Sequence, residues 1–480
     1  MSATHLAFQM PRASLVDRIL IPKFYDPDLK AAERLALGGF ELQELGELLL
    51  PGSKGSHLGN WIRRDHYGSG DIPFVRTSDL VNWRIRPDFK KAVSAEVYET
   101  VRVAQDISVG DLLFVAHGTY LVGQVAIVGA EEARLVLQDH VFRLRVDPGA
   151  GVHPHLLLAA LSTPFVRRQV RARQFSADII DKIGERHLGI KVPIPRLAAT
   201  RHQIINAVGK VLSDQDAARE EVRAVATLQS KMTKERASSN LGFSIARKDL
   251  RARILIPKYY DPQIAEEIAK VEASTQEKWG LISSYIDRGL LHAETGAEVG
   301  KMAYGMGSIP FLRTTDIVDL EMRRDPRHCV DAGTFASYAK KAGVVAGDVV
   351  LVRDGTYLVG SSAMVGKTDG DALISGGIYR LRALGELQPE SLLLALNLPL
   401  VRKQLRAVQF TRDVIDTLGK RALEVLVPPL TSERWVKAGA LLSKAMDRKA
   451  AARAGIGAAI ALADPPVAAS ANGRPSWSMR

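Results

Sequence analysis

Residues 197–237, LAATRHQIINAVGKVLSDQDAAREEVRAVATLQSKMTKERA, form the one long uninterrupted helical pattern of the chain. Steps of four and three residues in alternation connect Ile204, Val208, Val211, Gln215, Ala218, Val222 and Val225. This spacing is typical of the narrow seam along which two helices pack. Roughly forty residues at about 1.5 Å each make a rod of roughly 60 Å, which needs a partner helix to bury its seam.

A second pattern with the same rhythm near the C-terminus offers that partner. It runs through Trp435, Gly439, Leu442, Met446, Lys449, Arg453, Ile456 and Ile460. The charged positions Lys449 and Arg453 predict a poorer seam, and Gly439, Gly455 and Gly457 predict a helix broken by glycine. We expect the two helices to pack as an antiparallel coiled-coil pair that separates two globular domains.

The chain contains one unit twice. Residues 18–27, RILIPKFYDP, match residues 253–262, RILIPKYYDP, at an offset of 235 (253 − 18). Residues 67–79, YGSGDIPFVRTSD, match residues 304–316, YGMGSIPFLRTTD, at an offset of 237 (304 − 67). At the same offset, GDLLFVAHGTYLVG at residues 110–123 matches GDVVLVRDGTYLVG at residues 347–360. This last pair predicts two strands joined by a tight loop that contains glycine.

Each copy then changes from a strand pattern to a helical one. Residues 142–145 and 379–382 predict strands, whereas residues 164–171 and 399–406 predict helices that begin at proline. The repeat offset of 235 residues is far longer than the period of a solenoid protein, so it indicates a duplicated domain with its own helix. The expected fold is mixed α/β (α+β), with a first domain at residues 1–195, a central helix at 196–240, a second domain at 241–428, a C-terminal helix at 429–463 and a disordered tail at 464–480.

Composition limits the classes of function. The formal net charge of +12 favours a polyanionic partner such as nucleic acid or an acidic membrane face. The single cysteine, Cys329, excludes an internal disulfide and a cysteine-rich zinc site, so a structural metal is not expected. Because there is no apolar run of membrane-spanning length and no signal-peptide core, we expect a soluble, cytoplasmic protein.

Two apparent catalytic motifs are better explained structurally. Residues 360–368, GSSAMVGKT, place five residues between the glycines where a phosphate-binding loop requires four. Residues 464–467, DPPV, lack the aromatic residue that would stack on a flipped base in an amino-methyltransferase. We therefore expect no nucleotide cofactor and no catalytic residue in this chain.

Repeated arginines are the first candidates for nucleic-acid contact. Arg167 with Arg171, and Arg402 with Arg406, lie four apart on one helical face in each copy. There they could follow a phosphate backbone, or they could simply face solvent.

Strand ends and loop tips provide the other candidates. Arg76-Thr77 and Arg313-Thr314 end strands, where a guanidinium could reach a guanine edge, contact a phosphate or form a structural salt bridge. The two tight loops have the same flanking residues but differ at their tips. This variation is expected if each loop contacts a different nucleic-acid sequence, and it is equally expected if both are ordinary surface turns. The remaining candidates come from these tips and from the variable segment at residues 51–66: His117, Thr119, Tyr120, Arg353, Asp354, Thr356, Tyr357, Lys54, Arg63 and Arg64.

In their doubled order these motifs resemble the specificity (S, HsdS-like) subunits of type I restriction-modification systems, over nearly the whole chain. The resemblance implies two target recognition domains, each reading half of an asymmetric bipartite DNA site, with the helix pair setting the gap. It also implies two copies of an N6-adenine methyltransferase subunit and a translocase-nuclease subunit as partners, with S-adenosylmethionine, Mg²⁺ and ATP bound on those partners. The helix residues expected to engage partners are Ile204, Val208, Val211, Val222, Val225, Trp435, Leu442 and Met446.

Two other classes of function stay open from the sequence. One is an autonomous DNA-modifying enzyme with an unrecognised site, and the other is a scaffold of a related phage-defence complex. The recognised bases, the gap between half-sites and the presence of a nuclease do not follow from the sequence.

Overall fold

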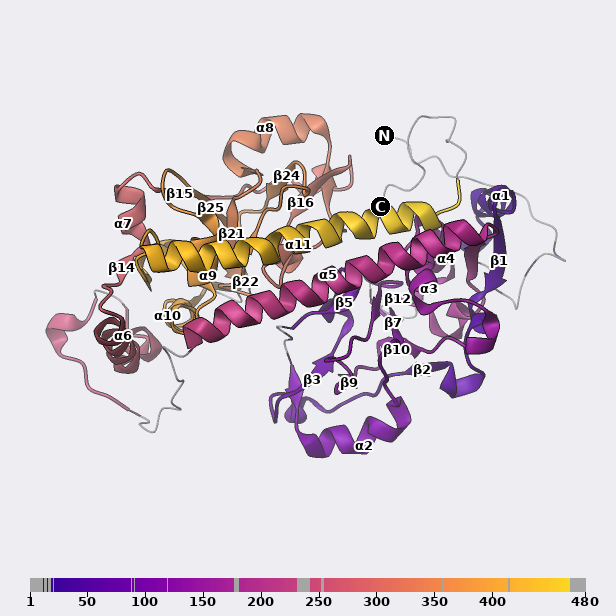
Figure 1. Ribbon diagram of the computed structural model, residues 1–480, viewed down its shortest axis with the longest axis horizontal. Helices are drawn as coiled ribbons and strands as arrows, with labels where there is room; N and C mark the ends of the chain where they lie inside the picture. Colours follow the sequence, from indigo (N-terminus) through magenta and orange to yellow (C-terminus); the bar gives the residue numbers. More distant parts are fainter. Residues whose placement is uncertain are drawn as a thin grey trace. The chain divides into compact units, whose positions relative to one another are not determined.

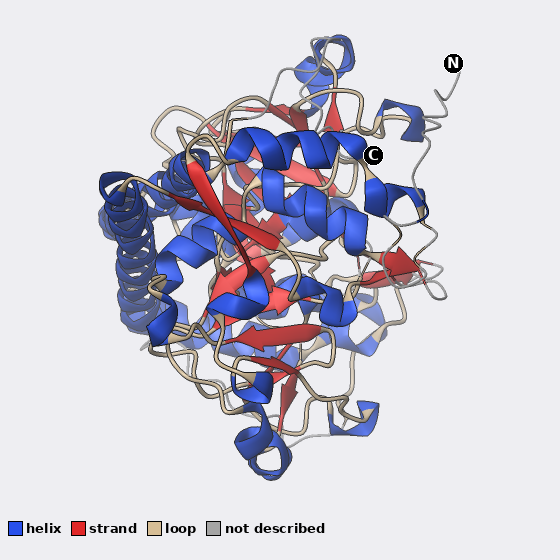
Figure 2. Ribbon diagram, turned by 90° about the vertical axis from the view of Figure 1, so that its right-hand side faces the viewer, coloured by secondary structure: helices blue, strands red, loops and turns tan. Residues whose placement is uncertain are grey.

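The computed structural model describes residues 21–87, 91–118, 120–176, 181–230, 242–251, 254–355, 358–412 and 415–466, together with Arg12, Leu15, Ile19 and Phe89. These residues fall into two compact units. Within the described ranges, the first unit takes in residues up to 83, 91–205 and 460 onward, and the second takes in 84–89 and 206–459. Both units contain strands and helices, which gives the mixed α/β character visible in Figure 2.

The first unit is built on two small sheets. One is four-stranded, in the order β2 (Ser56–Leu58), β10 (Val141–Leu144), β7 (Leu112–Val115) and β8 (Val125–Ile127). The other is three-stranded, in the order β6 (Ala92–Val93), β3 (Ile72–Val75) and β9 (Val136–Leu137). All four residues of β7 are apolar and buried, as expected of a strand covered on both faces. The other elements include β1 (Phe40–Glu44) paired with β13 (Lys191–Pro195), β11 (Phe175–Ser176) paired with β12 (Asp181–Lys182), the short strand β4 (Leu80–Val81), and the helices α1 (Pro27–Ala36), α2 (Ala95–Gln105), α3 (Pro154–Leu161) and α4 (Pro164–Arg173).

The second unit repeats this plan. Its four-stranded sheet has the order β15 (Leu291–Thr295), β25 (Ile378–Ala383), β21 (Val349–Val352) and β23 (Ser362–Met364). A second sheet contains β19 (Cys329–Val330), β16 (Ile309–Leu312), β24 (Ala372–Ile374) and β20 (Gly343–Val344). Because equivalent strands occupy equivalent places, the predicted duplication is confirmed, as are the antiparallel strand pairs β7–β8 and β21–β23 around each tight loop.

Further strands and helices complete the second unit. They are β14 (Gly280–Leu281) with β28 (Leu426–Val427), β17 (Ile317–Val318) with β18 (Glu321–Met322), β22 (Asp354–Gly355) with β27 (Ile415–Thr417) and β26 (Phe410–Arg412), and the helices α6 (Pro262–Thr275), α7 (Ile282–Asp287), α8 (Ala332–Ala342), α9 (Pro389–Leu396) and α10 (Pro399–Ala407). As predicted, α4 and α10 each begin at proline, whose missing N–H would have no partner in the first helical turn.

The two long helices are α5 (Ala198–Ser230) and α11 (Glu433–Ala463), which lie side by side in Figure 1. Within the second unit they run antiparallel, since Gly455 lies against Val211 while Arg448 Nε donates to Glu221 Oε1 at 3.0 Å. The predicted seam is confirmed, because its residues are buried, apart from the partly buried Val222: Ile204, Val208, Val211, Ala218, Val225, Trp435, Leu442 and Met446. The predicted continuation of the first helix beyond Ser230 lies outside the described residues.

The prediction that glycines break the second helix was wrong. α11 continues without interruption through Gly439, Gly455 and Gly457. A Cβ added at Gly439 would lie 2.6 Å from Ser391 Oγ, and one added at Gly455 would lie 2.6 Å from Val211 Cγ2. The two glycines therefore allow neighbouring elements to approach closely, a packing requirement that outweighs their weak helix propensity.

The structure also differs from the expectation that Lys449 and Arg453 weaken the seam. Both side chains are buried, and both are neutralised by carboxylates from loops of the second unit. Those carboxylates lie far away in sequence, so a local pattern could not reveal them.

The end of α11 has a structural role in the first unit. Asp464 follows the helix, and its carboxylate accepts a hydrogen bond of 3.2 Å from the backbone N–H of Phe165, in the first turn of α4. The rest of the predicted tail, from residue 467, lies outside the described residues. No helix in the described ranges is long and apolar enough to cross a membrane.

Candidate nucleic-acid interface

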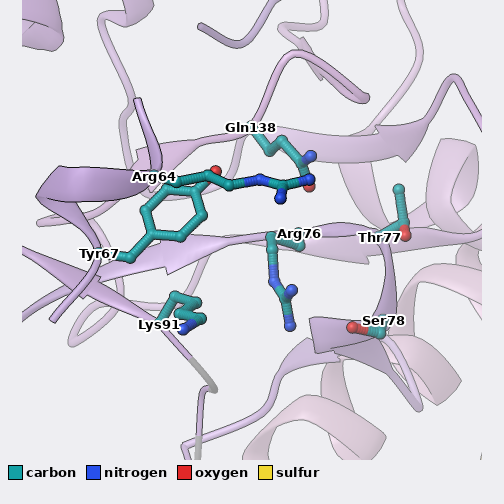
Figure 3. A pocket seen from close by; sticks show the side chains of 7 residues that line it. All are labelled: Arg64, Tyr67, Arg76, Thr77, Ser78, Lys91 and Gln138. Atoms are coloured by element: carbon teal, nitrogen blue, oxygen red, sulfur yellow. The ribbon is translucent and has the colours of Figure 1, made fainter. Parts of the chain in front are cut away.

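A cationic cavity lies in the first unit where β3 ends. It has a volume of about 430 Å³, and Figure 3 shows the side chains around it: Arg64, Tyr67, Arg76, Thr77, Ser78, Lys91 and Gln138. Among the described residues, no carboxylate lines it. Three cations around one cavity without a lining carboxylate create a site that attracts an anion.

Arg76 is the best-positioned of these cations. Its backbone N–H donates to Asp79 Oδ2 at 2.9 Å, and its Nε lies 3.7 Å from the same oxygen. The Nε is buried and has no hydrogen-bond partner among the described residues. In Figure 3 the side chain extends between Lys91 and Ser78. Arg76 is thus oriented by its own turn while retaining hydrogen-bond donors for a ligand.

An aromatic residue, Tyr67, lines another side of the cavity. The Tyr67 ring centre lies 5.2 Å from that of Phe74, a fully buried residue of β3, and Lys91 Nζ lies 5.5 Å from the Tyr67 ring centre. Tyr67 packs against a hydrophobic cluster that also includes Ile72 and Val93. This side of the cavity is therefore anchored to the core through Tyr67.

The second unit carries the same arrangement 237 residues later. Strand register fixes the equivalences, since Ile72 pairs with Val93 as Ile309 pairs with Val330. The Tyr304 ring centre lies 5.5 Å from that of Phe311, and the Arg313 N–H donates to Asp316 Oδ2 at 2.9 Å. The equivalents of the seven cavity residues, in the same order, are Lys301, Tyr304, Arg313, Thr314, Thr315, His328 and Ser375.

Two of these equivalent positions change the chemistry. His328 replaces Lys91, and its ring centre lies 4.5 Å from that of Tyr304. Burial, followed by the neighbouring Arg327 and Arg313, lowers the pKa of His328, so its ring is neutral at pH 7. Ser375 replaces Gln138, so a short hydroxyl stands where the first copy has an amide.

The surroundings of the second site contain two other perturbed groups. Burial raises the pKa of Asp316 to about 6, although the Arg313 N–H and Arg323 oppose the shift. Burial, followed by the Asp316 carboxylate, raises the pKa of the half-buried Cys329 thiol. Cys329 adjoins His328 and pairs with Pro310 of β16.

The predicted loop-tip residues are engaged within the protein. Burial, followed by the nearby His140, lowers the pKa of His117 to about 4, so this ring is neutral. Arg353 Nη2 lies 2.5 Å from Asp354 Oδ2, and Asp354 also accepts from Thr417 Oγ1 at 2.5 Å. Tyr120 is half-buried. The predicted residues Thr119, Thr356 and Tyr357 lie outside the described residues.

The predicted helical arginines differ in exposure. Arg167 and Arg171 of α4 are half-buried, and Arg402 of α10 donates to the Gly360 carbonyl. Arg406 is exposed.

The predicted cations of the variable segment also differ in position. Lys54 and Arg63 are exposed, and Arg63 pairs with Asp65 at 2.9 Å, whereas Arg64 lines the cavity. The structure therefore brings Arg64, Arg76 and Thr77 together.

Sequence reasoning missed the other cavity residues. Tyr67 opens one of the duplicated motifs, so its repetition as Tyr304 was an available signal. Lys91 and Gln138 belong to no repeated motif, and only the pairing of β3 with β6 and β9 brings them to Arg76. The dismissed loop at residues 360–368 packs on α11, because Thr368 Oγ1 donates to the Ala450 carbonyl at 3.2 Å.

The known proteins that this chain resembles are solved structures of low sequence identity. No family model and no curated protein matches the chain. A crystal structure of the type I restriction-modification S subunit from M. genitalium matches 88% of this chain and 93% of its own, with 11% identity and a TM-score of 0.34. The chain is similar to type I specificity subunits.

Two further solved structures are similar to this chain. The HsdS subunit from Thermoanaerobacter tengcongensis has 17% identity and a TM-score of 0.26, covering 88% of this chain and 94% of its own. A structure described as the basis of complex assembly and conformational transition of the type I R-M system has 16% identity and a TM-score of 0.27, covering 88% and 97%. At this identity the likeness concerns the fold, and the site rests on the residues described above.

Proposed function

We propose that this chain is the DNA specificity subunit of a type I restriction-modification or related phage-defence complex. In this role each unit would contact one half of an asymmetric bipartite site. The chain would direct N6-adenine methylation, and restriction where a nuclease subunit is present, while carrying no catalysis itself. The observation that carries the proposal is the cationic cavity of the first unit, whose tyrosine and arginine recur at the equivalent strand register of the second unit.

The chemistry of the cavity fits DNA. Guanidinium and ammonium groups without a competing carboxylate bind phosphate oxygens, and an arginine can also donate to both acceptors of a guanine edge. The shared groups, Arg76 and Arg313, suit contacts common to both halves. The half-buried amide of Gln138 at the cavity has no equivalent in the second unit, where the buried Ser375 takes its place, and this difference suits halves of different sequence.

In this proposal the helix pair binds the partner subunits. Two copies of an N6-adenine methyltransferase subunit would dock around α5 and α11, and a translocase-nuclease subunit would join the full complex. S-adenosylmethionine, Mg²⁺ and ATP would then bind on those partners.

Mapping methylated adenines tests the proposal. The chain should be co-expressed with its methyltransferase in a host without other adenine methylation, and the product should show one bipartite motif. Replacing residues 18–195 by the equivalent domain of another specificity subunit should change one half of the motif and leave the other unchanged. If both halves of the motif changed, the proposal that each unit contacts one half of the site would be contradicted. Turnover of DNA by the purified chain with Mg²⁺ and S-adenosylmethionine would instead favour an autonomous enzyme.

A further inference from the structure

Each repeat presents an equivalent loop to a long helix. The loop turns at two consecutive residues with positive φ, Asn82 (50°) and Trp83 (68°) in the first repeat and Asp319 (50°) and Leu320 (65°) in the second. Left-handed backbone is costly for residues other than glycine, so its occurrence at matched positions indicates that the tertiary contact holds the turn in this conformation. The residue that follows the turn is Arg84 in one repeat and Glu321 in the other.

In the first repeat a basic loop meets an acidic helix position. Arg84 Nη2 lies 2.6 Å from Asp216 Oδ1 and donates to the Leu212 carbonyl at 3.1 Å. Arg219, one turn further along α5, donates to the Ile85 carbonyl at 2.7 Å. Arg84 is only 5% exposed, so its charge depends on these partners. We name the Arg84–Asp216 pair the first clamp.

In the second repeat the signs are reversed. Glu321, 8% exposed, accepts from Arg453 Nη1, and Arg453 Nη2 also lies 2.8 Å from Asp369 Oδ2. Lys449 Nζ, one turn earlier on α11, lies 2.5 Å from Asp319 Oδ2 and 3.7 Å from Glu321 Oε1. We name the Glu321–Arg453 pair the second clamp.

The two clamps occupy equivalent positions in the repeats. Arg84 and Glu321 are separated by 237 residues (321 − 84), and so are Asp216 and Arg453 (453 − 216). This is the offset of the duplicated strand motifs. One ancestral contact is therefore present twice, with its polarity inverted at both members.

Inversion makes the wrong pairing unfavourable. If the first loop met the second helix, Arg84 would face Arg453 and Lys449. If the second loop met the first helix, Glu321 would face Asp216. A buried charge whose partner carries the same sign loses its compensation and is repelled, which is more unfavourable than a neutral mismatch. Solvent screens part of this repulsion at Asp216, whose side chain is 56% exposed, so the larger penalty falls on the buried Arg84, Glu321 and Arg453.

We propose that the faces of α5 around Asp216 and of α11 around Arg453 are docking surfaces of opposite charge preference, each selective for the loop of its own repeat. The selectivity keeps two similar domains from exchanging helices, either within one chain or between two copies of this chain. It concerns assembly and does not depend on the proposed DNA contact.

Charge reversal in the full chain tests the pairing first. Arg84→Glu alone and Asp216→Arg alone should each lower the thermal midpoint by several degrees, and the double variant R84E/D216R should recover most of the loss. The matched control is E99R/R102E, which reverses an exposed ion pair on α2 and should leave the midpoint unchanged. Losses that add in the double variant, without recovery, would overturn the clamp.

The double variant also tests selectivity, because it gives both repeats the polarity of the second clamp. Refolded from urea at increasing protein concentration, R84E/D216R should yield less monomer and more dimer with exchanged helices than the wild type, as measured by size-exclusion chromatography with light scattering. E99R/R102E should behave as the wild type does. If R84E/D216R recovers its thermal midpoint and still refolds to the same monomer fraction, the clamps are ordinary ion pairs and the proposed selectivity is wrong.

Discussion

Replacing Arg76 by alanine should weaken DNA binding through loss of a phosphate contact. Arg64, Arg76 and Lys91 surround one cavity, so the site can neutralise up to three phosphates. Each contact contributes about 0.9 to the slope of log K against log salt, because binding releases condensed counterions. The single variant should therefore flatten the slope by about 0.9. If the variant and the wild type bind equally at 1 M salt, the affinity of the variant at 0.1 M salt should be about eightfold lower than that of the wild type.

The triple variant R64A/R76A/K91A extends the same reasoning. If all three cations contact phosphate, the slope should flatten by about 2.7, and binding at 0.1 M salt should fall by a factor on the order of 500. Fluorescence anisotropy with a labelled duplex, measured from 0.05 to 0.4 M salt, gives both quantities. The assay should use the complex with its methyltransferase as well as the chain alone.

Two control variants distinguish the loss of a positive charge at the cavity from the loss of a positive charge elsewhere in the unit. Arg102→Ala removes one positive charge from the same unit, but Arg102 is exposed on α2 and pairs with Glu99, so its slope should stay at the wild-type value. Arg76→Lys keeps the charge and should keep most of the slope. Equal slopes for Arg76→Ala and the wild type, or equal losses for Arg76→Ala and Arg102→Ala, would refute the cavity as the DNA contact.

Three further predictions concern stability. Gly455→Ala should lower the free energy of unfolding in urea by about 1–3 kcal/mol, because the new Cβ would lie 2.6 Å from Val211 Cγ2. The control Gly457→Ala should be neutral or stabilising, because the nearest atom to its Cβ lies 3.4 Å away on the flexible Arg324 side chain. Trp435→Ala should cost about 3–5 kcal/mol, because this fully buried side chain fills the core beside α5, and Trp435→Phe should cost less. Burial raises the pKa of Asp316 from 3.8 to about 6, so the folded state binds a proton more tightly than the unfolded state. The free energy of unfolding should then fall by up to about 3 kcal/mol as pH rises from about 4 to about 6, and Asp316→Asn should remove that slope in urea titrations at each pH.

The sequence was sufficient for the features that repeat or have a period. Four-three spacing located the buried residues of α5 through Val225, and the doubled motifs located equivalent strands and prolines in the two units. These features depend on neighbours within a few turns or strands, which is the range that a linear pattern reports.

What escaped prediction depends on partners distant in the chain. Lys449 and Arg453 appeared unsuited to a seam because their partners Asp319, Glu321 and Asp369 lie about 80–130 residues earlier, in turns and in strand β18. Gly455 appeared to be a helix breaker because the need for space comes from Val211 on another helix. The cavity was found only in part, since Lys91 and Gln138 reach Arg76 through strand pairing and not through any shared motif.

The position of Cys329 makes the second repeat individually observable. This is the one cysteine of the chain, and it adjoins His328, whose ring lies against Tyr304. Its thiol is half-buried and has a raised pKa, so it reacts slowly at neutral pH and its labelling rate responds to small changes in access. A maleimide reagent would therefore report occupancy beside Arg313 while remaining silent about Arg76. The second half of a duplicated protein can thus be followed on its own without adding or removing a single residue.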